Sequence, residues 1–447
     1  MKINKIKPLR RVLIAALVPV SALLTPHGAS AEDLVDIYRL ASDSDPQLRA
    51  AAANNASVAE GQRQSDALYY PNISFGANVA RNRDETTGGL FPSDPLYYTG
   101  KGYSLNLTQA LYRRDFQLQK DQTAALSQQA QAQYQAAVQA LALRASERYF
   151  DVLAAQDNLE FAIAEKEAIS RQLEQTKQRF EVGLIAITDV HESQAAYDLA
   201  VASEIGAQNQ LATAHEALRE VTGQLTTAVD QLSDKMELIS PEPADVSEWV
   251  AAALDQNYDL KAAEAAVAAA RQQMKLQRAN RSPNVDLVAS HNYNDTGGVF
   301  GNRQSTSTSI GVQLNVPLYQ GGAIASRIRQ AQHQLDQAKD GLEQQRRAIH
   351  RATSDAYYNV QANISRVKAL KQAVISSESA LEATEAGYDV GTRTTVDVLN
   401  VRRNLYRAQR DYSRARYDYI ISTLRLKQAA GILAESDLVQ INAWLEE

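Results

Sequence analysis

Apolar and polar residues recur along this chain with two spacings. The first, of three and four residues, runs through a stretch without proline or glycine between Arg113 and Glu181, and it is typical of helices packed as coiled coils. Its seam consists of Tyr134, Val138, Leu141, Ala145, Tyr149, Val152, Gln156, Leu159 and Ile163. Residues 323–389 repeat the design, interrupted by Gly341 and, near the end, by Gly387. We predict two helices, each roughly 100 Å long at 1.5 Å per residue.

Shorter helices are predicted beside the long ones. Residues 189–222 and 396–430 follow the two long stretches and are about half as long, so they cover only part of them. Residues 46–69 and 257–280 have the same helix-forming composition and precede Pro71 and Pro283. Stacked end to end, two shorter helices could pair with one long helix. The chain is therefore predicted to be mainly α-helical.

The second spacing is a strict alternation, which predicts four strands at about 72–81, 102–110, 284–293 and 308–316. Their apolar positions are Ile73, Phe75, Ala77, Val79, Tyr103, Leu105, Leu107, Val285, Leu287, Ala289, Ile310, Val312, Leu314 and Val316. Lengths of about 9–11 residues suit tilted strands of an outer-membrane barrel, and tyrosines near the strand ends suit its aromatic girdle. The loops 82–101 and 294–307 are then extracellular turns. The alternative is a soluble sheet packed against the helices.

Four strands do not close a membrane barrel, because spanning barrels have at least about eight. Open strand edges are not tolerated in lipid. If the strands lie in a membrane, copies of the chain must therefore share one barrel. Two copies would supply eight strands and three copies twelve, and the residues alone allow either.

The two halves of the chain are copies of one plan. Residues 180–190 read FEVGLIAITDV and residues 388–398 read YDVGTRTTVDV, so the motifs are 208 residues apart. Gly183 and Gly391 stand where each long helix must stop, and glycine there can adopt the left-handed conformation of a helix C-terminus. Each motif is predicted to be the tip of a helical hairpin. The returning helix would then be capped by Thr188 or Asp189 in the first tip and by Thr395 or Asp397 in the second.

The N-terminus has the pattern of a secretory signal peptide. A basic segment is followed by the apolar run 12–24 and by Ala29-Ser30-Ala31, a small-residue cleavage pattern. The run is too short for a transmembrane helix, which needs about 20 residues. We predict a signal peptide at 1–31, a first structural repeat at 32–240, a second at 241–435 and a C-terminal tail at 436–447.

Charge and composition exclude several functions. Five of the 46 Lys and Arg and none of the 52 Asp and Glu lie in 1–31, so the mature chain has a net charge of 41 − 52 = −11. This acidic balance argues against nucleic acid as a partner. There is no cysteine for a thiolate site. His215-Glu216 begins a zinc-protease pattern, but Arg219 stands where the second histidine ligand belongs. We predict neither an enzyme nor a bound metal or cofactor.

With this duplicated plan and both tip motifs, essentially all of the mature sequence resembles the TolC family of outer-membrane channels. The resemblance implies a homotrimer whose chains share a 12-stranded barrel in outer-membrane lipid, above a long helical tunnel in the periplasm. It also implies a periplasmic adaptor (membrane fusion) protein and an inner-membrane transporter as partners. Such ducts serve multidrug efflux and type I protein secretion.

The resemblance also implies a gate at the periplasmic end. Carried over by motif position, its network uses Asp189 in the first tip and Tyr388 and Arg393 in the second, and Asp397 supplies an acidic ring. Three residues beyond Asp397 the family's best-known pattern has a second aspartate, but this chain has Asn400. Cation selectivity should persist but weaken.

Two other interpretations remain open from the residues alone. Both aspartates have an obvious structural role as helix-capping or first-turn acids, Arg393 could be an ordinary surface cation, and Tyr388 could simply pack. For the whole chain, the alternative is an exported structural or adhesive coiled-coil protein without a pore.

Overall fold

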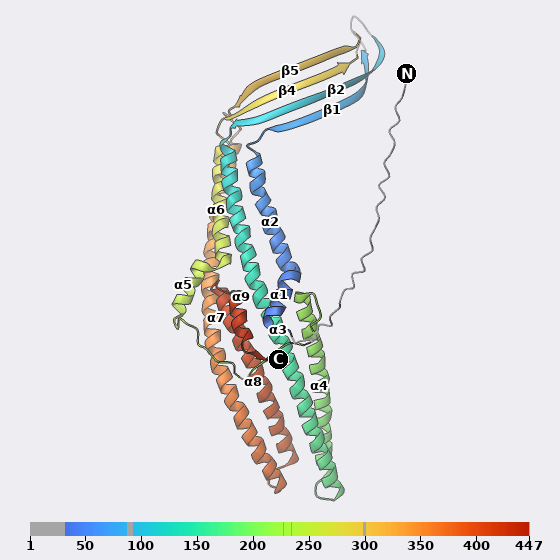
Figure 1. The fold of residues 1–447 in the computed structure, drawn as a ribbon, viewed down its shortest axis with the longest axis vertical. Helices are drawn as coiled ribbons and strands as arrows, with labels where there is room; N and C mark the ends of the chain where they lie inside the picture. Colours follow the sequence, from blue (N-terminus) through green and yellow to red (C-terminus); the bar gives the residue numbers. More distant parts are fainter. Residues whose placement is uncertain (1–31, 87–92, 227, 234, 298–300, 447) are drawn as a thin grey trace, which may run out of the picture.

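The computed structural model describes residues 32–86, 93–226, 228–233, 235–297 and 301–446. The predicted signal peptide lies outside this part of the chain. A sheet occupies one end of an elongated molecule, long helices run from it to two hairpin tips at the other end, and shorter elements form a belt around the middle (Figure 1). We call these three parts the sheet, the tunnel helices and the belt.

The tunnel helices confirm the pattern of spacing three and four. The two long helices are α3 (Arg114–Glu181) and α7 (Ala323–Asp389). Their shorter partners are α2 (Pro46–Ala67), α4 (Ile187–Thr222), α6 (Tyr258–Ala279) and α8 (Thr395–Ala429). The long helices end where the glycine motifs begin. The start of α2 follows from Asp45, whose carboxylate accepts the amide of Leu48 at 2.9 Å, and from a proline in its first turn.

The tunnel helices lie side by side in one order along the whole molecule. Near the sheet, α3 lies between α2 and α6, and α6 packs on α7. Near the tips, α3 lies between α4 and α8, and α8 packs on α7. The order is therefore α2, α3, α6, α7 above the belt and α4, α3, α8, α7 below it. As predicted, two short helices stacked end to end complete each long one.

The four predicted strands are present, and all are longer than predicted or shifted outward. They are β1 (Asn72–Thr86), β2 (Ser93–Tyr112), β4 (Asn284–Thr296) and β5 (Arg303–Asn315), antiparallel in the order β1-β2-β4-β5. The predicted loop 82–101 was wrong over most of its length, because Arg83 pairs with Tyr97 and Ala80 with Gly100. Backbone pairing continues there although the apolar alternation has stopped. Of the two predicted loops, residues 87–92 and 298–300 lie outside the described part.

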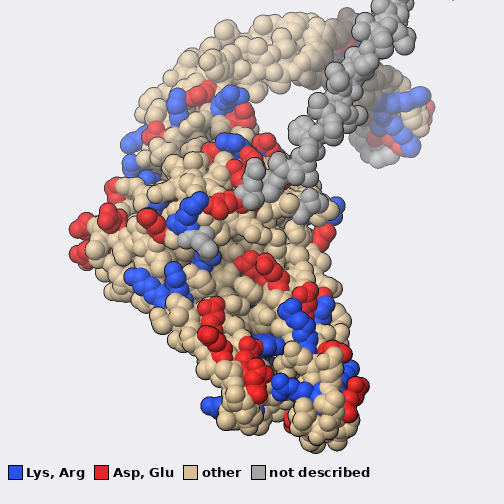
Figure 2. Space-filling model, turned by 60° about the horizontal axis from the view of Figure 1, so that its bottom comes forward, with Lys and Arg blue, Asp and Glu red and all other residues tan. Residues whose placement is uncertain are grey.

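The two faces of the sheet differ as the alternation predicts. Cross-strand partners such as Phe75 and Leu105, or Leu287 and Val312, place apolar side chains on one face. Phe75 and Val312 are 69% and 65% exposed in the isolated chain. The opposite face carries serine, asparagine and glycine. Charged side chains gather on the helices and at the far end of the strands, leaving most of the sheet without them (Figure 2). This is the amphipathic pattern of a strand layer between lipid and water.

No helix in the described part of the chain is both long and apolar enough to span a lipid bilayer.

The belt is the part that the sequence patterns missed. Its helices are α1 (Leu34–Ser44), α5 (Val246–Gln256) and α9 (Glu435–Asn442), and a two-stranded sheet joins β3 (Gln231–Leu232) to β6 (Leu445–Glu446). The largest buried cluster lies here, where belt side chains pack on Tyr149, Phe150 and Ile420 of the tunnel helices. The predicted C-terminal tail is thus part of the core, since Leu438 is fully buried.

Candidate gate at the hairpin tips

Each long helix ends at a glycine in the left-handed region. The φ angles of Gly183 and Gly391 are +78° and +80°. The turn is closed by a hydrogen bond from the amide of Leu184 to the carbonyl of Arg179 (2.9 Å), and in the second tip by one from Thr392 to Gly387 (2.8 Å). A side chain at either glycine would strain the turn. Both predicted hairpin tips are therefore present.

The returning helices are capped one to three residues earlier than predicted. Thr394, not Thr395 or Asp397, caps α8, because its hydroxyl accepts the amide of Asp397 at 3.2 Å. The Asp397 carboxylate in turn accepts the amide of Thr394 at 2.9 Å, which completes a capping box. In the first tip the cap position is Ala186, whose amide donates to Asp189 at 3.2 Å. Alanine has no side-chain acceptor, so that box is half complete.

Asp397 is exposed but electrostatically favoured as an anion. Its hydrogen bonds from the backbone and side chain of Thr394, together with the nearby Arg393 cation, hold its pKa below the usual range. It therefore stays ionised at neutral pH. This fits the predicted acidic ring as well as the capping role, and the two are compatible because one carboxylate can cap a helix and still face solvent.

Tyr388 contacts an arginine that the sequence analysis did not single out. The guanidinium of Arg179, in the last turn of α3, lies 4.5 Å from the centre of the Tyr388 ring. Its Nη2 atom is also 3.2 Å from a carboxylate oxygen of Asp389. The Tyr388 hydroxyl accepts a long hydrogen bond, 3.5 Å, from Thr395. Arg179 thus joins the two hairpin tips within one chain, through a cation–π contact and an ion pair.

The predicted network is not assembled within one protomer. Asp189 bonds only to its own tip, and Arg393 has no side-chain hydrogen bond or ion pair among the described residues. The stem of Arg393 lies against α7 at Gly387, where an added Cβ would come within 2.8 Å of it. Arg393 and Asp189 therefore leave charged groups available at the ends of two different tips.

A comparison of the repeats could have revealed Arg179. At the 208-residue offset its counterpart in the second repeat is Gly387, and the counterpart of Asp389 is Glu181. The second tip therefore has glycine where the first has Arg179. The side chain of Arg393 lies against that glycine. The tip motifs were recognised by the residues that the two repeats share, whereas the contact between the tips depends on residues at which the repeats differ.

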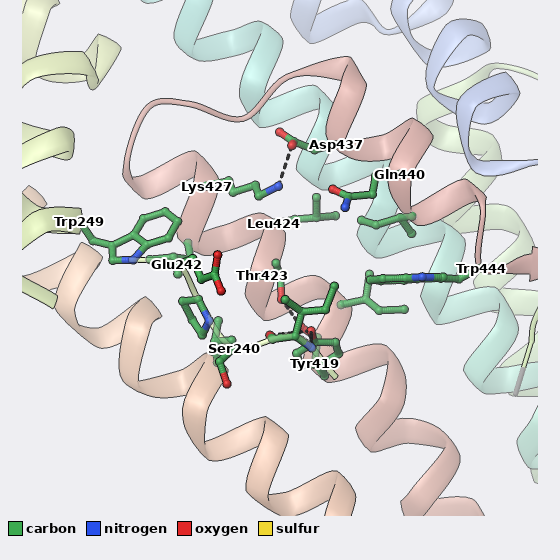
Figure 3. A pocket seen from close by; sticks show the side chains of 16 residues that line it. Ser240, Glu242, Trp249, Tyr419, Thr423, Leu424, Lys427, Asp437, Gln440 and Trp444 are labelled. Atoms are coloured by element: carbon green, nitrogen blue, oxygen red, sulfur yellow. Dashed lines mark hydrogen bonds and ion pairs between the residues drawn. The ribbon is translucent and has the colours of Figure 1, made fainter. Parts of the chain in front are cut away.

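A second candidate is a cavity in the belt (Figure 3). It measures about 220 Å³ and lies between α8, α9 and residues 239–242. Several polar groups around it are already bonded: Lys427 to Asp437 at 2.7 Å, and the Tyr419 hydroxyl to the carbonyl of Ile239 at 3.0 Å. The Trp249 indole donates to the carbonyl of Pro243. The cavity therefore belongs to the packing of the belt.

Comparison with known proteins decides between a channel and a scaffold. The family described as outer membrane efflux protein matches residues 37–224 and 249–432, one match for each repeat. The chain belongs to this family. It is accordingly an outer-membrane channel with a long periplasmic extension, and no enzyme family is involved. The recurrence of the match confirms the internal duplication predicted from the tip motifs.

Relatives with curated descriptions cover nearly the whole chain. Outer membrane protein TolC of Vibrio cholerae is 41% identical over 420 residues, which is 93% of this chain and 94% of the relative. Outer membrane protein TolC of Escherichia coli is 35% identical, and the alignment covers 95% of this chain and 88% of the relative. The alkaline protease secretion protein AprF of Pseudomonas aeruginosa is 29% identical, and the alignment covers 94% of this chain and 89% of the relative.

Solved structures share the fold. The Campylobacter jejuni CmeC outer membrane channel superposes with a TM-score of 0.77 at 16% identity, covering 92% of this chain and 90% of that structure. VceC, an outer membrane protein of Vibrio cholerae, superposes with a TM-score of 0.74 at 21% identity, covering 89% of this chain and 96% of that structure. The paired strands and the tunnel helices are thus the architecture of outer-membrane channels.

Proposed function

We propose that three copies of this chain form an exit duct across the outer membrane and the periplasm. Its closed periplasmic end opens when a periplasmic adaptor and an inner-membrane transporter dock there. The duct serves both efflux and type I secretion, and the choice of cargo lies with the transporter. The names of the relatives support both uses, since they include proteins described as efflux and as protease secretion proteins.

One observation carries the proposal: each protomer is an arc with the same two open edges throughout its length. In the sheet, β1 and β5 each pair on one side only within the described chain. Below the sheet, α7 lies at one edge of the layer, with α2 and then α4 at the other. An open strand edge is not tolerated in lipid. Copies that join β5 to the next β1 close the sheet and the helix layer together.

This closure also places the tips of neighbouring copies side by side. The helix order puts α7 of one copy beside α4 of the next, so the second tip of one copy adjoins the first tip of its neighbour. Arg393 of one tip and Asp189 of the other carry opposite charges. We propose that they pair between subunits, while Arg179 joins the tips within each subunit. Asp397 supplies one carboxylate per subunit to the opening.

Disulfide cross-linking tests the shared barrel, because the chain has no cysteine of its own. Ser74→Cys on β1 will be combined with Ser305→Cys, Ser307→Cys or Ser309→Cys on β5, all on the polar face. At least one pair should give covalent dimers and trimers under oxidising conditions. Ser290→Cys with Ser309→Cys is the matched control: their hydroxyls are 2.9 Å apart within one chain, so it should give monomers only. Monomers from every combination would contradict the shared barrel.

A further inference from the structure

The lower half of α8 is unusually rich in arginine. Within residues 402–416 the sequence RRNLYRAQRDYSRAR contains six arginines and one aspartate. Arg402, Arg410 and Arg416 are partly buried and bond to neighbouring elements. Arg403, Arg407 and Arg414 are exposed. With spacings of four and seven residues these three lie on one face of the helix.

That face points away from the belt. The belt contacts α8 through Arg416, Tyr419 and the side chains that line its cavity. At 100° per residue, positions 403, 407 and 414 lie about 120–180° around the helix from Arg416 and Tyr419. Since the belt covers one side of the helix layer, the three arginines are on the other side. In the proposed assembly, on which this inference rests, that side is the inside of the tunnel.

Two hollows adjoin Arg414, one of the three exposed arginines. One hollow, of about 670 Å³, lies between α7 and α8 and is lined by Asn359, Asn363, Arg414 and others. Another, of about 410 Å³, lies between α3, α4 and α8 and is lined by Arg410, Arg414, Asn158 and others. These hollows are next to the arginine face and are large enough for small solutes.

The positive charge is only partly neutralised. Arg414 pairs with Asp151 at 3.1 Å and with Asp418 at 3.0 Å. Arg403 and Arg407 have neither an ion pair nor a side-chain hydrogen bond among the described residues, although both act electrostatically on Glu165 of α3. They lie four residues apart, where like charges repel each other and destabilise a helix. Their spacing therefore does not stabilise α8 itself.

The exposed positions between 400 and 414 on α8 carry three arginines and one aspartate, Asp411, a net charge of +2 per protomer. Three copies would form a basic band. Arg403 is six residues beyond Asp397, or about 9 Å along the helix, and Arg414 is about 25 Å beyond it. An acidic ring at the opening would thus be followed by a basic band in the tunnel.

We propose that Arg403 and Arg407 form an anion-binding band inside the tunnel, which receives small organic anions bearing carboxylate groups. Guanidinium groups bind carboxylates through paired hydrogen bonds, and unpaired arginines in a narrow, water-filled space concentrate anions. Arg414 contributes less, because two aspartates already bind it. The band would favour anionic cargo that has passed the gate.

The test uses the purified full-length trimer with citrate as the probe. Citrate added from the barrel side should block single-channel current in the unmodified protein. Arg403→Gln with Arg407→Gln should raise the half-blocking concentration at least tenfold, while Arg403→Lys with Arg407→Lys should keep most of the block. Arg39→Gln, which removes one cation from the belt helix α1, should leave the half-blocking concentration unchanged. Equal block in the double glutamine variant and the unmodified protein would overturn the proposal.

A binding measurement separates this proposal from the proposed channel. Calorimetric titration of citrate into the detergent-solubilised trimer does not depend on conductance. Binding that is lost in the double glutamine variant, from a protein that conducts nothing, would keep the anion site and reject the channel. Conductance without citrate binding would do the reverse, because it would keep the channel and reject the anion site.

Discussion

Changing Tyr388→Phe together with Arg393→Ser is expected to raise the open probability of the channel by about tenfold. Arg393 has no ion pair or side-chain hydrogen bond in the described part of its own chain, and in the proposed assembly the helix order places it beside Asp189 of the next copy. An exposed ion pair contributes about 0.2–1 kcal/mol. Three such pairs broken together would shift the gate by roughly 1–3 kcal/mol, and 1.4 kcal/mol is a factor of ten. Single-channel recordings measure the change.

Two control variants change residues of α7, the helix that carries Tyr388, at positions away from the tip. Arg347→Ser removes an equally exposed cation that pairs only with Glu343, one turn away. Tyr358→Phe removes the hydroxyl of an exposed tyrosine. Both should leave the open probability unchanged. If the tip variant behaves as these controls do, Arg393 and Tyr388 are a surface cation and a packing residue.

The second large effect concerns stability. Tyr149→Ala is expected to lower the free energy of unfolding by about 3–5 kcal/mol per chain, the range for deleting a buried aromatic side chain. Tyr149 is fully buried where α3 meets the belt, its ring stands edge-on to Phe150, and its hydroxyl donates to the carbonyl of Asp230 at 2.8 Å. The midpoint of thermal unfolding should fall by about 5 °C or more, measured by far-ultraviolet circular dichroism in detergent.

Two further variants separate packing from hydrogen bonding at this position. Tyr149→Phe keeps the ring and loses one hydrogen bond, so it should cost only about 1 kcal/mol. Tyr358→Ala removes an exposed tyrosine from the other long helix and should change the midpoint little. A Tyr149→Ala protein as stable as Tyr358→Ala would show that the belt does not hold the tunnel helices together.

Regular elements could be predicted from the sequence because each carries a long signal. The absence of proline and glycine between Arg113 and Glu181 leaves nothing to interrupt a helix, and glycine at 183 marks its end. Strand ends were harder: beyond residue 81 the chain is polar, yet it stays paired. A backbone ladder needs a partner strand, which the alternation of side chains does not reveal.

The belt escaped prediction because its elements are short and are held by contacts distant in sequence. The amide of Leu34, for example, donates to the Asn442 side chain, 408 residues away. At the tips, the motif located Gly391 at the end of α7 correctly, but the capping residue of α8 depended on where that helix starts. Arg179 was missed because its partner Asp389 lies in the other repeat.

The central claim is that copies of this chain close into a channel. The most direct measurement is the single-channel conductance of the purified mature protein in a planar bilayer, with its mass in detergent determined on the same sample. We expect a particle of three chains with a small conductance, closed at the tips until partners dock. A water-soluble monomer that conducts nothing would contradict it.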